Sequence, residues 1–110
     1  MKIETLQVDQ GSLIRVSGRV DTTNYTDFEA AFVPLLQAGK KNILLDCSGL
    51  NYISSTGLRV LLTVQKRMTS VDGKFILFAM QPNIREIFDI SGFSSIFRIL
   101  ETEEQAIKAL

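Results

Sequence analysis

One boundary in the sequence holds three consecutive hydroxyl side chains and a glycine, Ser54-Ser55-Thr56-Gly57. A compact apolar run precedes it and apolar residues at helical spacing follow it, so we expect a helix to begin at Ser55 or Thr56. The free amide groups of a first helical turn, together with the helix dipole, favour an anion there. A serine at this position can carry a phosphate, and Arg59, four residues after Ser55, can lean back toward it. The pattern makes phosphorylation of a serine feasible.

Helix capping is the plainer explanation of the same residues. Serine and threonine are preferred at N-cap positions whatever a protein does, and a cap contributes about 1 kcal/mol of stability. Gly57 falls in the first turn, where the missing side chain lets other groups approach the backbone closely. The spacing alone favours a cap formed by Ser54, Ser55 or Thr56, and it leaves phosphorylation open as the second interpretation.

Two aspartates are further candidates for a site. Asp21 follows the second strand of an expected hairpin, and Asp46 follows the apolar run Ile43-Leu44-Leu45. If both strands end there, the two carboxylates lie at one edge of the sheet, where α/β proteins bind ligands. The alternatives are a helix cap for Asp21 and a turn acceptor for Asp46. Without a histidine, lysine or metal motif beside them, they do not define an acid–base pair.

The composition excludes several classes of chemistry. The absence of histidine removes a Ser-His-Asp triad and the commonest metal ligand. Cys47 is the only cysteine, so no intrachain disulfide can form, and we expect it to be a packing residue. The 12 basic and 12 acidic residues cancel in formal charge, and no phosphate-binding glycine loop is present. We therefore expect no enzyme activity, no metal, no cofactor and no nucleic-acid partner.

Apolar periodicity predicts an opening β-hairpin followed by alternating helices and strands. The expected elements are strands over 2–9 and 12–17, ended by Gly18, a helix over 23–38 with a kink at Pro34, a strand over 42–47, a helix over 57–69, a strand over 74–80, a helix from Pro82 to a cap at Gly92, a strand over 95–100 and a helix starting at Thr102. This order indicates a single α/β domain over 1–110, with a mixed, mostly parallel sheet and helices packed on it. No stretch approaches about 18 apolar residues, so we expect a soluble cytoplasmic protein without a membrane partner.

Three segments, in this order, resemble a known family. They are Gly18-Arg19-Val20-Asp21 at the end of the hairpin, DCSGLNYISSTGL from Asp46, and QPNIREIFDISGF from Gln81. The chain is similar to the STAS domain over nearly its whole length, and within that family to the bacterial anti-sigma factor antagonists. The resemblance implies a STAS-type fold and a regulatory binding protein. It implies a monomer or weak dimer that acts in partner switching and so regulates transcription.

The resemblance also implies the partners and the phosphorylated residue. Members of this group bind an anti-sigma factor that is a serine kinase, and phosphorylation by that kinase ends the binding until a PP2C-type phosphatase restores it. Carried over by position, the phosphorylated residue is Ser55, followed by Thr56 and Gly57. This chain has Ser54 where well-studied antagonists have an aspartate, which changes the local charge that a kinase would meet.

The resemblance places two more residues and leaves two other functions open. Asp21 and Asp46 match positions in the loops near the phosphorylated serine, and with Arg59 they are expected to flank the partner-binding surface. The alternative within the family is a constitutive scaffold or adaptor subunit of a larger complex, either stressosome-like or lipid-transporting, in which Ser55 is only a cap. The alternative from another class is a weak nucleotide-binding module that uses the two aspartates and the hydroxyls.

Overall fold

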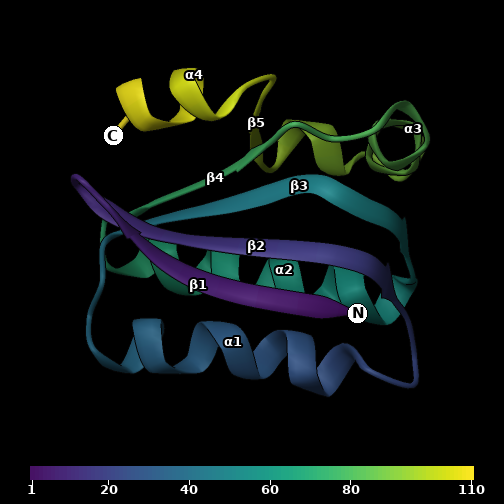
Figure 1. Ribbon diagram of the computed structural model, residues 1–110, viewed down its shortest axis with the longest axis horizontal. Helices are drawn as coiled ribbons and strands as arrows, with labels where there is room; N and C mark the ends of the chain where they lie inside the picture. Colours follow the sequence, from purple (N-terminus) through teal and green to yellow (C-terminus); the bar gives the residue numbers. More distant parts are fainter.

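The computed structural model describes all 110 residues, and its core is one mixed five-stranded sheet (Figure 1). The strands are β1 (Lys2–Val8), β2 (Gly11–Val20), β3 (Asn42–Ile53), β4 (Lys74–Phe78) and β5 (Arg98–Leu100), and they lie in this order across the sheet. The hairpin partner β1 is antiparallel to β2, and each later strand is parallel to its neighbour. The predicted α/β domain with an opening hairpin and a mostly parallel sheet is confirmed.

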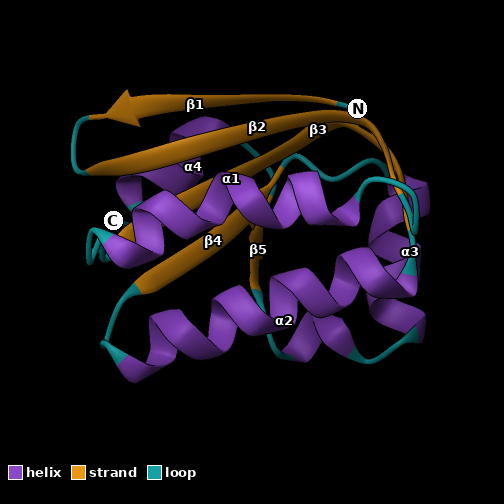
Figure 2. Ribbon diagram, turned by 90° about the horizontal axis from the view of Figure 1, so that it is seen from below, coloured by secondary structure: helices purple, strands orange, loops and turns teal.

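The helices cover the two faces of this sheet unequally. Two long helices, α1 (Tyr25–Gln37) and α2 (Ser55–Ser70), lie side by side on one face (Figure 2). The short α4 (Glu103–Lys108) covers part of the opposite face, and α3 (Pro82–Ile90) with the 3-10 turn η1 (Phe93–Ser95) lies near β5 (Figure 1). No helix combines the length and the apolar character that crossing a membrane requires.

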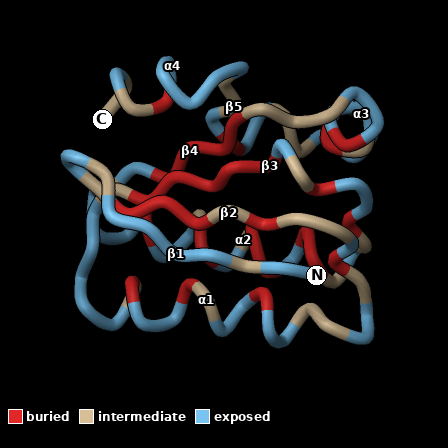
Figure 3. Tube along the Cα trace, viewed as in Figure 1, coloured by how far each residue is buried: buried red, intermediate tan, exposed pale blue.

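The main core fills the space between the sheet and the two long helices. It contains 21 buried apolar residues, visible as the buried stretches of the sheet and of the inner helix sides in Figure 3. Phenylalanine rings in this core make edge-to-face contacts. The ring centre of Phe32 lies 5.4 Å from that of Phe28 and 5.8 Å from that of Phe75. Phe97 continues the series, 6.3 Å from Phe75 and 5.7 Å from Phe88. Because each such pair adds about 0.5–1.5 kcal/mol beyond burial, these rings fix α1 and α3 against the sheet.

Two strands extend further than predicted, and both extensions lead to the candidate site. Gly18 does not end β2; its φ of +91° accompanies an irregularity in the register, and the strand continues to Val20. The predicted end of β3 at Cys47 is also wrong, because the strand continues through SGLNYI to Ile53. The polar residues of this segment are typical of a turn, but they stay paired with β2. The two strands lie so close that a Cβ atom added to Gly49 would lie 2.7 Å from Ser17 Cβ. Close strand pairing therefore replaces the predicted turn.

Smaller boundary differences occur elsewhere in the chain. The strand β4 ends at Phe78, not Met80, because Ala79 takes a left-handed conformation with φ +59°. The strand β5 begins at Arg98, not at Ser95, because Ser95 belongs to η1 and the chain turns at Ile96 and Phe97. Helix α1 contains Pro34 and ends at Gln37, one residue before its predicted end. Gly92 follows α3 in a left-handed conformation, which confirms the predicted cap.

Candidate functional site

Ser54 is the residue that caps α2. Its backbone is extended, with φ −84° and ψ 173°, and its Oγ accepts a hydrogen bond from the amide of Gly57 at 3.3 Å. Its own amide donates to the carbonyl of Val20 at 2.9 Å, while its carbonyl accepts from Leu58. Its hydroxyl also lies 2.7 Å from that of Thr56. The capping function and the candidate phosphate acceptor are therefore different residues.

Ser55 is the first residue of α2, and of the three hydroxyl residues it is the exposed one. Ser54 and Thr56 are half-buried and hydrogen-bonded to each other, whereas the Ser55 hydroxyl makes no hydrogen bond within the chain. The first-turn amides of α2 have no partners inside the helix and favour an anion. The geometry thus leaves Ser55 as the accessible hydroxyl beside an anion-favouring helix end.

Gly57 is required by the packing of the first turn of α2. A Cβ atom added to it would lie 2.7 Å from Ile53 Cγ1 and 2.9 Å from Val20 Cγ1. Both of those side chains are buried in the main core. The predicted close approach to this glycine is therefore made by the ends of β2 and β3, which hold the start of α2 directly against the sheet.

Asp21 lies where the sequence predicted, at the carboxyl end of β2 and beside the start of α2. It directly follows Val20, whose carbonyl accepts from the Ser54 amide. Its carboxylate accepts from the hydroxyl of Thr23 at 2.6 Å and from the Thr23 amide at 2.9 Å, and these bonds lower the pKa of Asp21. The alternative role as the N-cap of α1 is wrong, because Asn24 occupies that position.

Asp46 lies in the middle of β3, so its predicted place at the sheet edge is wrong. Its Oδ2 accepts from Nε of Arg15 at 2.8 Å, and its Oδ1 accepts from the Ser48 amide at 2.9 Å. Arg15 also bonds Glu103 of α4 at 3.2 Å, so this network lies on the α4 face, opposite α2 and Ser55. Burial alone would raise the pKa of Asp46, but the hydrogen bonds from Arg15 and Ser48 outweigh it and the pKa is lowered.

The separation of Asp21 from Asp46 argues against the alternative of a nucleotide-binding module. A nucleotide-binding module that used both carboxylates together needed them at one site, and the structure places them on different parts of the sheet. No group of three or more histidine, cysteine, aspartate or glutamate side chains is arranged to hold a metal ion.

Cys47 is buried in the core, where burial raises the pKa of its thiol to about 12. It is a packing residue, as predicted.

Two residues beside the candidate serine were not selected from the sequence. Arg19 and Tyr52 are paired across β2 and β3, and the guanidinium carbon lies 4.3 Å from the centre of the tyrosine ring. Arg19 Nε also lies 3.8 Å from a carboxylate oxygen of Asp21. Each residue precedes a recognised one by two positions, Asp21 and Ser54 respectively. Extending both predicted strands by a few residues would have placed them at the site.

Arg59 is exposed on α2 one turn after Ser55, and it belongs to none of the six ion pairs in the structure. Residues three or four apart on a helix lie on the same side, so its guanidinium is free to approach a group on Ser55. It lines a hollow of about 120 Å³ between α1 and α2, together with Tyr25, Glu29, Thr56, Val60 and Thr63.

The family follows from comparison of this sequence with known families. The sequence model of the STAS domain matches residues 2–106. The chain belongs to the STAS domain family. This STAS domain is 37% identical over 109 residues to BtrV of Bordetella bronchiseptica, which is named as a candidate anti-sigma factor antagonist; the match covers 99% of this chain and 94% of BtrV. It is 25% identical over 104 residues to the anti-sigma-B factor antagonist of Staphylococcus epidermidis, covering 94% and 96% of the two chains.

Solved structures share the fold of this STAS domain. An anti-sigma factor antagonist from Mycobacterium paratuberculosis superposes with a TM-score of 0.90 at 22% identity, over 98% of this chain and 92% of that one. The unphosphorylated form of the anti-sigma factor antagonist SpoIIAA gives a TM-score of 0.82 at 22% identity, over 98% and 95%. The phosphorylated form of SpoIIAA from Bacillus gives 0.77 at 23% identity, over 98% of both chains.

Proposed function

We propose that this STAS domain is an anti-sigma factor antagonist whose binding is controlled by phosphorylation of Ser55. In this proposal it binds an anti-sigma factor with serine-kinase activity through the surface around the start of α2. Phosphorylation by that kinase ends the complex, and a PP2C-type phosphatase restores it. The protein acts by binding, not by catalysis, and so regulates transcription that depends on a sigma factor.

The observation that carries the proposal is that two of three adjacent hydroxyls are hydrogen-bonded in the fold, whereas the third is exposed and makes no hydrogen bond. Ser54 caps the helix and bonds Thr56, so both are committed to holding the local structure. Ser55 is exposed and holds nothing in place. A kinase can therefore reach its hydroxyl, and modification of it removes no interaction on which the fold depends. The names of the relatives BtrV and the staphylococcal antagonist support the same function.

The physical effect of the phosphate is electrostatic and steric. It adds about −1.5 to −2 charges at neutral pH. Within the free protein the helix end and the nearby Arg59 stabilise that charge, so we expect little change in the backbone of α2. In the complex the same charge lies on a surface that must meet a partner closely, and a like charge or a lost contact there costs several kcal/mol.

The replacement of the family's aspartate by Ser54 fits this mechanism. Aspartate and serine are both favoured N-caps, so the structural function of the position is retained. The serine removes one negative charge beside Ser55, which lowers the repulsion that a new phosphate meets. A kinase partner of this chain is expected to accept a neutral residue immediately before the phosphorylated serine.

Phosphate mapping tests the proposal. The purified protein is incubated with its candidate anti-sigma kinase and ATP, and the modified residue is located by mass spectrometry. We expect phosphate on Ser55 alone, and none in the Ser55→Ala variant. A Ser54→Ala variant is the matched control and should still be phosphorylated. No phosphate on Ser55 in the wild type would favour a constitutive scaffold instead.

A further inference from the structure

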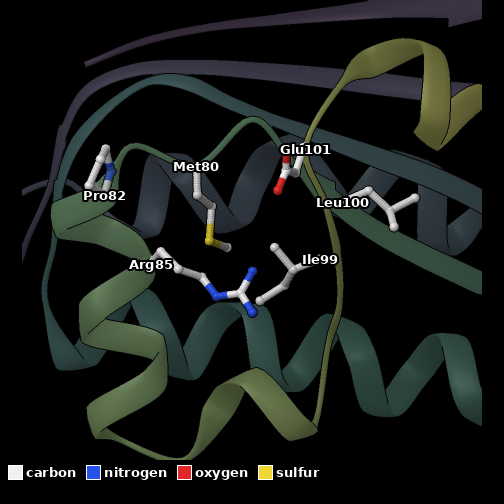
Figure 4. Close-up of a pocket in the computed structure, with 6 residues that line it drawn as sticks. All are labelled: Met80, Pro82, Arg85, Ile99, Leu100 and Glu101. Atoms are coloured by element: carbon white, nitrogen blue, oxygen red, sulfur yellow. The ribbon is translucent and has the colours of Figure 1, made fainter.

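A cavity of about 320 Å³ lies between α3 and β5 and shares no lining residue with the surface around Ser55 (Figure 4). Six residues line it: Met80, Pro82, Arg85, Ile99, Leu100 and Glu101. Its volume is at the lower end of the range for small-ligand pockets. It also lies past the carboxyl ends of the parallel strands β4 and β5, the edge at which α/β sheets commonly bind ligands.

Arg85 presents an unpaired guanidinium edge to this cavity. Its Nε donates to Oδ1 of Asp89 at 3.2 Å, and Asp89 also accepts from the hydroxyl of Ser94. Its two Nη atoms make no hydrogen bond within the chain, and in Figure 4 they project between Met80 and Ile99. Two parallel N–H groups of this kind match the two oxygens of a carboxylate.

Glu101 supplies the opposite charge. Its side chain points toward the same cavity from the end of β5, and it forms no ion pair with Arg85 (Figure 4). Its backbone amide is held by the side chain of Gln105 at 3.0 Å. The cavity therefore has a cationic group, a separate anionic group, and the apolar side chains of Met80 and Ile99 between them.

The wall of the cavity is held in a defined shape by interactions with β3. Gln81 Nε2 donates to the carbonyl of Ser48 at 3.0 Å, and Asn83 Nδ2 donates to that of Asn51 at 3.1 Å. These bonds fix the chain on both sides of Pro82. A wall that is already ordered favours binding, because less conformational freedom is lost when a ligand enters.

The backbone immediately before Met80, a lining residue of the cavity, is strained. Ala79 has φ +59°, a conformation that alanine rarely adopts, and its amide donates to the carbonyl of Leu100 at 3.2 Å. This bend takes the chain off β4 and brings Met80 to the cavity. Strained backbone of this kind is concentrated at binding sites, where the surrounding structure holds it in place.

We propose that this cavity binds a small zwitterion. The ligand's carboxylate bonds the Nη atoms of Arg85, its ammonium group bonds the carboxylate of Glu101, and its apolar carbons contact Met80 and Ile99. Free apolar amino acids and short ω-amino acids belong to this class. The site does not involve Ser55, so this inference is independent of the proposed phosphorylation.

NMR titration of the ¹⁵N-labelled full chain tests the site. Leucine and ε-aminocaproate are the zwitterionic probes, and caproate and hexylamine are the matched probes with one charge each. We expect at least one zwitterion to give saturable shifts at the amides of Met80, Arg85 and Glu101, with a millimolar or tighter dissociation constant. Caproate and hexylamine should bind at least tenfold more weakly.

Variants assign the binding to the two charges. Arg85→Gln and Glu101→Gln should each weaken the zwitterion at least tenfold, whereas Glu86→Gln, on the exposed side of the same helix, should leave it unchanged. A Ser55→Ala protein should bind the probe as the wild type does. Absence of saturable shifts with both zwitterions, equal binding of the singly charged probes, or full binding by both variants would each overturn the proposal.

Discussion

Two polar regions lie along or just after the strand β3, and they differ in how many of their polar groups make hydrogen bonds within the chain. In the middle of the strand, Asp46 is bonded to Arg15 and to the Ser48 amide, and Arg15 continues to Glu103 of α4. Just beyond the end of the strand, Ser55 is exposed and its hydroxyl has no partner. Both are prominent polar residues in the sequence, but only one is available for chemistry.

This difference shows how the structure separates a side chain that joins elements of the fold from one that is exposed and makes no hydrogen bond. The Arg15–Asp46 pair joins β2 to β3 and, through Glu103, to α4. Its removal should therefore lower the free energy of unfolding. The Ser55 side chain is exposed and makes no hydrogen bond within the chain, so its removal should leave the stability of the fold unchanged. The comparison predicts opposite consequences: variants of Asp46 should lose stability and keep binding, and a negative charge at Ser55 should leave stability unchanged and weaken binding.

The largest stability effect is expected for Asp46→Ala. The Asp46 side chain is only 7% exposed, and its loss leaves Arg15 without its shortest ion pair. Breaking a fully buried pair costs 3–5 kcal/mol, but the Arg15 side chain is 38% exposed and regains water, so we expect about 2 kcal/mol. Urea unfolding of the variant and the wild type measures this. A loss below about 0.5 kcal/mol would contradict the stabilising function of the pair.

The same pair predicts a dependence on pH. The pKa of Asp46 is lowered in the folded protein, so its ionised form stabilises the fold above the unfolded pKa of about 4. That stabilisation is lost as the pH falls through the still lower folded pKa. The stability difference between the wild type and Asp46→Asn should therefore be constant from about pH 5 to 7 and shrink below about pH 4. A difference that grows on acidification would contradict this assignment.

Sequence patterns were sufficient to predict the fold and the position at which α2 begins. Apolar periodicity is set by burial, and residues such as Phe28 and Phe32 are buried as their helical spacing indicates. The hydroxyl run marked the start of α2 because N-cap preference is local in sequence. Those features depend on neighbours a few positions away, which is the range that a sequence pattern can resolve.

The errors came from interactions between distant residues. The extension of β3 to Ile53 depends on pairing with β2, more than 30 positions earlier, so the polar segment after Cys47 resembled a turn. Asp46 was expected near the end of its strand, and it lies in the middle because the strand continues past Cys47; its side chain is held there by Arg15. The choice of Ser54 over Ser55 as the cap also required the backbone geometry, because either serine suits that function in sequence terms.

A smaller effect should separate the two adjacent serines. Ser54→Ala removes the bond to the Gly57 amide and should cost about 1 kcal/mol. Ser55→Ala removes no hydrogen bond within the chain and should change stability by less than about 0.5 kcal/mol. Thermal unfolding of both variants beside the wild type measures the contrast. Equal losses in the two variants would contradict the division between cap and acceptor.

The most direct test measures the affinity of the anti-sigma kinase for this protein in different states of Ser55. Calorimetry would compare the unphosphorylated wild type, the fully phosphorylated wild type, Ser55→Ala and Ser55→Asp. The account predicts that Ser55→Ala binds as the unphosphorylated protein does, and that the phosphorylated protein and Ser55→Asp bind at least tenfold more weakly. Equal affinities for all four proteins would contradict the claim that charge at Ser55 controls the choice of partner.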